Sequence, residues 1–145
     1  KTPLKFQIER YDHLNELAVV WVQLPRLAAA DAAQHIWLYY GNEKAPAAAD
    51  AKGGYDASQL LVFHLSESQG PPQDASGNGV VPSKGESSPV QVGLIGGAAR
   101  MAANGGLEMN LAPLQAPAGF TFSAWVRPAS VDGELLAYRG SHLQR

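Results

Sequence analysis

The alternation of apolar and polar residues predicts short β-strands along most of the chain. In residues 120–128, Phe-Thr-Phe-Ser-Ala-Trp-Val-Arg-Pro, four apolar residues share one side of an extended chain, and a Trp lies among the polar residues on the other. Neither side is then plainly solvent-exposed, which is typical of a central strand in a sandwich of two sheets. Pro128 ends the strand, because proline has no N–H to donate to a ladder.

The remaining apolar runs are also of strand length. We expect strands at residues 4–9, 17–24, 35–40, 60–65, 94–102, 107–109 and 134–138. The turn Asn104-Gly105-Gly106 predicts a hairpin. Between the strands we expect turn-rich links at 10–16, alanine-rich connectors with at most a short helix at 26–34 and 45–52, and an irregular loop at 66–93.

The sequence therefore predicts an all-β protein of two segments. Residues 1–54 form a small β-domain, and residues 55–145 form part of a β-sandwich. Because predicted elements run close to both Lys1 and Arg145, we expect an excised piece of a longer protein that lacks the start of its first domain and the end of its second.

Charge and composition exclude several classes of function. The net charge is −2 and the 11 basic residues are scattered, so neither nucleic acid nor an anionic membrane surface is an expected partner. The absence of cysteine excludes disulfides, thiolate nucleophiles and Cys-ligated zinc. No apolar run approaches the ~18 residues of a membrane span, so we expect no membrane contact by this fragment.

Four motifs in the second segment together resemble a known fold. They are Val62-Phe-His-Leu65 followed by Glu67, Asp74-Ala-Ser-Gly-Asn-Gly79, Gly93-Leu-Ile-Gly-Gly-Ala-Ala-Arg-Met101 and the strand 120–128. Their order and spacing resemble the laminin-G-like jelly roll of the concanavalin A type. The resemblance covers about residues 60–145 and implies a partial jelly-roll sandwich without its later strands. Met101 stands where the family usually has an aromatic residue.

The first segment resembles a small bacterial β-domain of unknown function. The resemblance is carried by Val20-Trp-Val-Gln-Leu-Pro25 and by Ile36-Trp-Leu-Tyr-Tyr-Gly-Asn42. Such domains precede jelly rolls in envelope proteins, including the periplasmic N-terminal region of the MotA/TolQ/ExbB proton channel family, which serves biopolymer transport. The resemblance implies an exported bacterial protein of the periplasm or cell envelope. Nothing in these residues themselves indicates a channel.

The loop 74–79 holds the candidate metal ligands. The Asp74 carboxylate and the Asn78 amide are hard oxygen ligands of the kind that calcium uses, and some laminin-G-like domains bind calcium. The alternative is an Asx-type turn, in which both side chains bond to nearby backbone groups. No other cofactor is implied.

The sequence offers few candidates for catalysis. His64 is expected to be a hydrogen-bonded histidine at the face or edge of a sheet, with catalysis or metal ligation as the alternative. The acidic pair Asp132 and Glu134 spans a turn at Gly133 and does not form the paired carboxylates of a glycosidase strand. The glycines of 93–97 indicate close packing or a bulge, not a phosphate loop. We therefore expect no enzyme.

Aromatic residues supply the candidate ligand-binding site. Trp37 and Tyr39 share one face of the predicted strand 35–40 and could form a platform for a sugar or a protein; packing in a core or domain interface is the alternative. The expected function is a non-catalytic binding module that contacts an envelope protein or a glycan such as peptidoglycan. The alternatives are a carbohydrate-binding accessory domain of a secreted or surface hydrolase, and a plain spacer. Unpaired strand edges predict a dimer or strand exchange.

Overall fold

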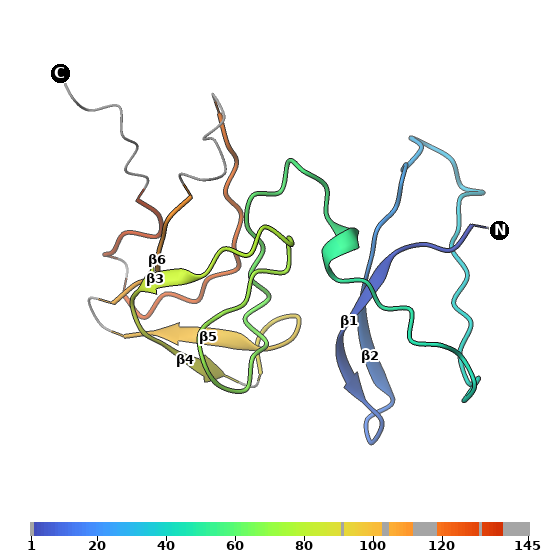
Figure 1. Cartoon of the computed structure of the whole chain (residues 1–145), viewed down its shortest axis with the longest axis horizontal. Coiled ribbons are helices and arrows are strands. Elements are labelled where there is room, and N and C mark those ends of the chain that lie inside the picture. Colours follow the sequence, from blue (N-terminus) through green and yellow to red (C-terminus); the bar gives the residue numbers. More distant parts are fainter. Residues whose placement is uncertain (1, 91, 103–104, 112–118, 131, 138–145) are drawn as a thin grey trace.

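The computed structural model describes residues 2–90, 92–102, 105–111, 119–130 and 132–137. Within these ranges the protein is essentially all β, as predicted, and has one 3₁₀ turn but no α-helix (Figure 1). The described elements are β1 (Phe6–Asp12), β2 (Leu17–Val22), η1 (Lys52–Gly54), β3 (Pro82–Lys84), β4 (Ser87–Val90), β5 (Ala98–Met101) and β6 (Glu108–Met109).

These strands form three antiparallel sheets of two strands each, in the pairs β1–β2, β3–β6 and β4–β5. The β1–β2 hairpin lies at one end of the molecule and the other two sheets lie at the opposite end (Figure 1). The segment around residues 55–65 runs between them. In the described part of the chain, no helix is long and apolar enough to cross a membrane.

The β1–β2 hairpin confirms the first two predicted strands, but β1 continues to Asp12 instead of ending at residue 9. Asp12 also closes the turn, because its carboxylate accepts hydrogen bonds from the backbone N–H and the side-chain amide of Asn15 at 3.2 and 2.9 Å. The register changes within β1. Ile8 lies opposite Val20 and Arg10 lies opposite Val19, so the intervening Glu9 has no partner and forms a β-bulge.

The predicted irregular loop 66–93 is wrong in its second half, which contains β3 and β4. Prolines within a run argue against a central strand, and this signal obscured both elements. Pro82 begins β3, and Pro89 lies in β4 opposite Ala99. Each strand pairs on one side only among the described residues, which is where proline is tolerated.

Several predicted strands are wrong as ladder elements. Residues 35–40, 120–128 and 134–137 form no ladder, and Tyr138 lies outside the described residues. In residues 60–65 only Phe63 pairs, through an isolated bridge to Asp74. These segments have strand composition, but a ladder also needs a neighbouring strand in register, which strand composition alone does not supply.

The predicted hairpin turn at 104–106 includes Asn104, which lies outside the described residues. The flanking strands pair elsewhere, β5 with β4 and β6 with β3. The alanine-rich residues 26–34 contain no helix, and the second alanine-rich stretch ends in the 3₁₀ turn η1.

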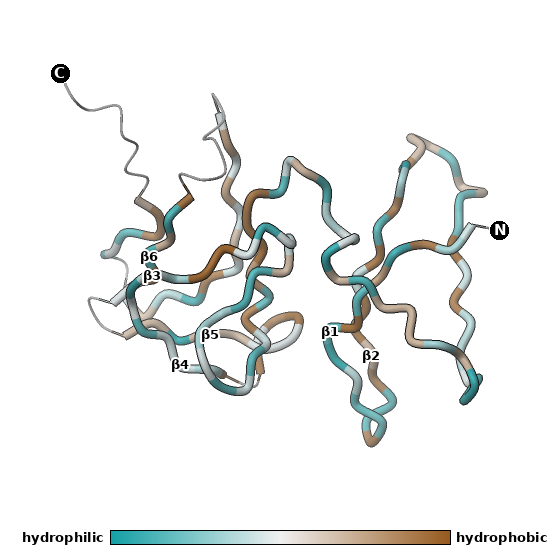
Figure 2. Tube along the Cα trace, viewed as in Figure 1, coloured by the Kyte–Doolittle hydropathy of each residue, from teal (hydrophilic) through white to brown (hydrophobic). Residues whose placement is uncertain are grey.

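Burial is concentrated where the loop after residue 71 packs against the chain around residue 62. In the described residues the most buried positions are Pro72, Val80 and Gly96, and Val80 is 8% exposed. Many large apolar side chains are exposed, including Tyr40 and Trp125 at 90% and 79%. Figure 2 shows apolar residues spread over both parts of the trace instead of gathered in one layer.

Candidate functional site

The most specific side-chain cluster joins the hairpin to the segment 55–65. Glu9 accepts a hydrogen bond from the indole Nε1 of Trp21 at 3.0 Å, and the same carboxylate oxygen, Oε2, lies 3.1 Å from Nδ1 of His64. The other ring nitrogen of His64, Nε2, lies 2.8 Å from the hydroxyl of Tyr55. We call Glu9, Trp21, Tyr55 and His64 the Glu9–His64 cluster.

The cluster is well shielded from solvent and closely packed. The side chains of Glu9 and His64 are 2% and 10% exposed. The His64 ring lies 5.3 Å from the Trp21 ring and 6.2 Å from the Tyr55 ring, measured between centroids. The predicted hydrogen-bonded histidine is thereby confirmed, and its partners are now known.

The bulge in β1 places Glu9 in this cluster. In a regular ladder each residue faces a partner across the pair, whereas a bulge residue is released from pairing and its side chain is re-aimed. Glu9 is the released residue. The glycines of 93–97 complete the enclosure, because a Cβ on Gly96 would lie 2.6 Å from Glu9 Oε1 and one on Gly97 would lie 2.7 Å from the carbonyl oxygen of Leu65. The prediction of close packing at these glycines is confirmed.

The contacts allow either protonation state of His64. In the neutral ring, Nδ1–H donates to Glu9 and Nε2 accepts from the Tyr55 hydroxyl; in the charged ring both nitrogens donate, and the hydroxyl turns to accept. The neighbouring cavity, of about 310 Å³, is lined by Glu9, Arg10, Ser66, Val92, Gly96 and Gly97. Tyr55 and His64 do not line it. The cluster therefore acts as a side-chain link, which we call the latch, between the β1–β2 hairpin and the segment 55–65.

Burial raises the pKa of Tyr55 above 10.0, and the nearby Glu9 carboxylate raises it further. When folding raises the pKa of a group, the protonated group stabilises the fold. This stabilisation is complete below the unfolded-state pKa, and it is lost as the pH rises through the folded-state pKa. We expect the wild type to lose stability above pH 10.0 in part through Tyr55, and Tyr55→Phe to lack this part.

Urea denaturation across this alkaline range measures the difference between the two proteins. Tyr11→Phe is the control, because the Tyr11 side chain is 73% exposed on the same hairpin. Equal alkaline loss of stability in Tyr55→Phe and in the wild type would contradict the assignment.

The loop 74–79 forms the Asx-type turn that was weighed against a calcium site. Asp74 Oδ1 accepts hydrogen bonds from the Ser76 backbone N–H and hydroxyl at 2.9 and 2.7 Å and from the Val62 N–H at 3.1 Å. Its Oδ2 accepts from the Val80 N–H at 3.2 Å. The Asn78 amide nitrogen donates to the carbonyl oxygens of residues 59 and 60 at 3.0 and 3.1 Å.

These bonds make the loop a clamp on the segment 59–62. Partial burial alone would raise the pKa of Asp74, but the hydrogen bonds from Ser76, Val62 and Val80 together outweigh it and lower the pKa below 3.8. No three His, Cys, Asp or Glu side chains of the described chain group closely enough to hold a metal. Calcium binding at Asp74 and Asn78 stays a prediction.

The aromatic residues predicted to bind a ligand lie on an exposed strip, which we define as residues 36–40. The exposed fractions are 54% for Ile36, 66% for Trp37, 76% for Leu38, 73% for Tyr39 and 90% for Tyr40. The Trp37 ring makes an edge contact with His35 at 5.1 Å between centroids. All five side chains of the strip are exposed in the described structure, and ligand binding by Trp37 and Tyr39 stays a prediction.

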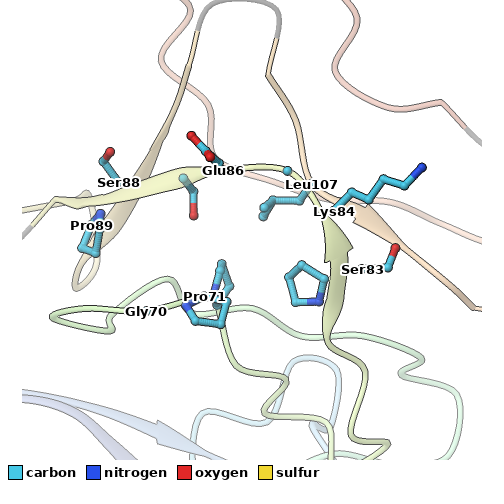
Figure 3. Close-up of a pocket in the computed structure, with 12 residues that line it drawn as sticks. Gly70, Pro71, Ser83, Lys84, Glu86, Ser88, Pro89 and Leu107 are labelled. Carbon is cyan, nitrogen blue, oxygen red and sulfur yellow. The ribbon is translucent and has the colours of Figure 1, made fainter.

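A second cavity, of about 430 Å³, lies between the loop 70–72 and strands β3 and β4 (Figure 3). The ring of Pro71 and the side chain of Leu107 point toward it, whereas Lys84, Glu86 and Ser88 point away. Lys84 instead pairs with Glu108 at 3.7 Å. Pro71 and Leu107 therefore give the cavity apolar contacts, and its lining also includes polar residues such as Ser83 and Ser87.

Sequence reasoning singled out His64 but missed its partners. Glu9 and Trp21 lie on separate strands, and only the bulge brings the carboxylate to the histidine. Tyr55 was placed in a different segment from Glu9, because the glycines at 53 and 54 suggested a boundary. Glu9 lies among other polar residues of β1, such as Gln7 and Arg10, so the sequence gives no signal that sets it apart.

Comparison with known proteins bears on the first part of the chain. Residues 1–64 match the family described as a domain of unknown function (DUF2341). No curated protein and no solved structure matches the chain. The matched range ends at His64 and includes all four members of the Glu9–His64 cluster. The predicted resemblance of the first segment to a β-domain of unknown function is thus confirmed as a match to DUF2341 over residues 1–64.

Proposed function

We propose that the chain is a non-catalytic interaction module of an exported bacterial protein and that the strip 36–40 is its contact surface. The observation that carries this proposal is the exposure of two aromatic rings, Trp37 and Tyr39, together with three further large side chains in five consecutive residues. Contiguous apolar surface of this kind marks interaction sites on soluble proteins. Trp and Tyr are also the residues that dominate binding energy at interfaces.

The partner we propose is a component of the cell envelope, either a protein or a glycan such as peptidoglycan. The motif order supports this context: a segment that matches DUF2341 precedes motifs that resemble a laminin-G-like jelly roll. In this proposal the second segment belongs to such a jelly roll, and the parent protein carries a membrane part resembling the MotA/TolQ/ExbB proton channels. The module would link that motor to its envelope partner.

A carbohydrate-binding accessory domain of a secreted hydrolase is the second candidate. It is favoured by the spacing of Trp37 and Tyr39, because residues i and i+2 of an extended segment share one side and lie about 7 Å apart along the chain. The parent gene separates the two candidates. Membrane helices after residue 145 support the motor context, and a catalytic domain with no membrane helices contradicts it.

The contact surface itself is tested by co-sedimentation with isolated peptidoglycan and by capture of crosslinked envelope proteins. We expect Trp37→Ala and Tyr39→Ala each to weaken binding about tenfold or more, because each removes a ring of the strip. Tyr11→Ala is the matched control, since Tyr11 is as exposed as Tyr39, at 73%. Unchanged binding in both strip variants, or equal loss in the control, would show that the strip is not the contact surface.

A further inference from the structure

The dipeptide Asn78-Gly79 has the sequence that favours a spontaneous reaction of asparagine. Glycine has no side chain to shield its backbone nitrogen, so this nitrogen can reach the side-chain carbonyl carbon of a preceding asparagine. Both residues are exposed, so water reaches them. The other asparagines of the described chain, at positions 15, 42 and 110, are followed by glutamate or leucine, whose side chains obstruct the same approach.

The nitrogen that would attack is free to move. Among the described residues, the Gly79 N–H has no hydrogen-bond partner. A Cβ on Gly79 would meet no atom within 4 Å, so the space around it is open. The φ of Gly79 is +71°, in the left-handed region that favours glycine, so the fold itself calls for a glycine after Asn78.

The amide that would be attacked is held instead. Asn78 Nδ2 donates to the carbonyl oxygens of Gln59 and Leu60 at 3.0 and 3.1 Å, and it lies 3.2 Å from Ser76 Oγ. The reaction expels Nδ2, so all of these contacts have to break for it to proceed. The clamp on the segment 59–62 is therefore what restrains the reaction.

We propose that Asn78 is a modification site whose deamidation is controlled by opening of the clamp. The Gly79 nitrogen forms a bond to Cγ of Asn78, the Cγ–Nδ2 bond breaks, and Nδ2 leaves as ammonia with the Gly79 amide proton. Water then opens the cyclic imide at either carbonyl and leaves aspartate or isoaspartate at position 78. The reaction needs only water, and the proposal is independent of the strip 36–40 and of the envelope partner.

The modification would release one half of the clamp. An ionised carboxylate only accepts hydrogen bonds, so at position 78 it would face two further acceptors, the carbonyl oxygens of Gln59 and Leu60. Isoaspartate would also add an atom to the backbone between Ser76 and Val80, which both donate to Asp74. Refolding does not restore the lost amide, so the release is permanent.

Peptide mapping by mass spectrometry measures the conversion rate at Asn78 at mildly alkaline pH. We expect the folded chain to convert on the order of tenfold more slowly than the chain unfolded in urea, because the clamp is closed in most folded molecules. Asp74→Ala should convert several-fold faster than the wild type. Asp56→Ala is the matched control and should convert at the wild-type rate, because Asp56 holds only its own Ser58 in the same kind of turn.

Low urea concentrations separate opening of the clamp from global unfolding, and they do so even if Asp74→Ala fails to fold. A local opening exposes little surface, so the wild-type rate should stay nearly constant well below the unfolding midpoint. A rate that rises in step with the unfolded fraction, or equal rates in the folded and unfolded chains, would overturn control by the clamp. No conversion at Asn78 in the unfolded chain would overturn the site itself.

Asn78→Asp tests the consequence of the modification. We expect it to raise the equilibrium constant for unfolding roughly fivefold, because two backbone carbonyls lose their donor. Asn42→Asp is the matched control, since exposed Asn42 accepts the Lys44 N–H through Oδ1 at 3.0 Å and a carboxylate keeps that bond. Equal stability of the two variants would overturn the release of the clamp.

Discussion

We expect His64→Ala to lower the free energy of unfolding by about 3 kcal/mol, because removing the imidazole leaves the shielded Glu9 carboxylate without one of its hydrogen-bond donors. The Glu9 carboxylate would keep only the Trp21 N–H as a donor, and the Tyr55 hydroxyl would lose its partner on Nε2. Urea denaturation measures the change. Since the Glu9 side chain is 2% exposed, water can do little to replace the contact that His64 provided.

Two further variants test whether the loss in His64→Ala comes from its contact with Glu9. Lys84→Met breaks the exposed pair with Glu108, whose side chains are 77% and 69% exposed, and we expect almost no change in stability. Glu9→Gln combined with His64→Ala should be less damaging than the sum of the single changes, because the two residues act on each other. Strict additivity, or a loss in His64→Ala no larger than in Lys84→Met, would rule out the latch.

Asp74→Ala is the second large effect that we expect, with a loss of about 2 kcal/mol. The carboxylate accepts bonds from three backbone N–H groups and one hydroxyl, and one of those N–H groups belongs to Val80, a buried residue. Without the carboxylate these donors have no acceptor, and the loop 74–79 loses its hold on the segment 59–62. Thermal or urea unfolding measures the loss.

The sequence provides a matched control for this change. Asp56-Ala-Ser58 repeats the Asp74-Ala-Ser76 pattern, and Asp56 likewise accepts the backbone N–H and the hydroxyl of its serine. Asp56 bonds to no other segment through its carboxylate among the contacts seen, so Asp56→Ala should be far milder. Similar losses in the two variants would show that the local turn matters and that the clamp does not.

The Asp74 carboxylate also makes the stability of the folded protein depend on pH in the acid range. Its pKa is lowered in the folded protein, so its contribution is present above the unfolded-state value near 3.8 and is lost as pH falls through the lower folded-state value. Between these two values the wild type should lose stability more steeply than Asp74→Asn, which has no proton to take up. Parallel pH curves for the two proteins would contradict this.

The sequence was sufficient for elements whose signals are local. The strands at 4–9 and 17–24 and the turn-rich link between them were predicted from local composition, and Asp12 and Asn15 lie in that link. The Asx-type turn at Asp74 was the alternative to a calcium site, and its partner Ser76 is only two residues away. Elements that depend on distant partners were not predictable. Residues 35–40 and 120–126 carry strand composition, yet composition does not supply the neighbouring backbone that makes a ladder.

The candidate site residues also divide into those that local sequence features indicate and those that depend on distant partners. Trp37 and Tyr39 were candidates because of their type and spacing, which are local features of the sequence, and both are exposed. Glu9 was not identified, because its meeting with His64 spans most of the first 64 residues and depends on a one-residue bulge that pattern analysis does not detect. The boundary expected near residue 54 followed from glycine composition, whereas the side chains of Glu9 and Tyr55 both contact His64.

The bulge at Glu9 has a consequence for how the molecule would respond to tension. Among the described contacts, a pull on the hairpin would reach the segment 55–65 through the Glu9 carboxylate–His64 imidazole contact and through the Trp21 ring packed on His64, in addition to the covalent chain. Deleting Glu9 would restore a regular ladder and remove the carboxylate contact at the same time. Hydrogen exchange of the hairpin amides would then become less coupled to exchange in residues 60–65.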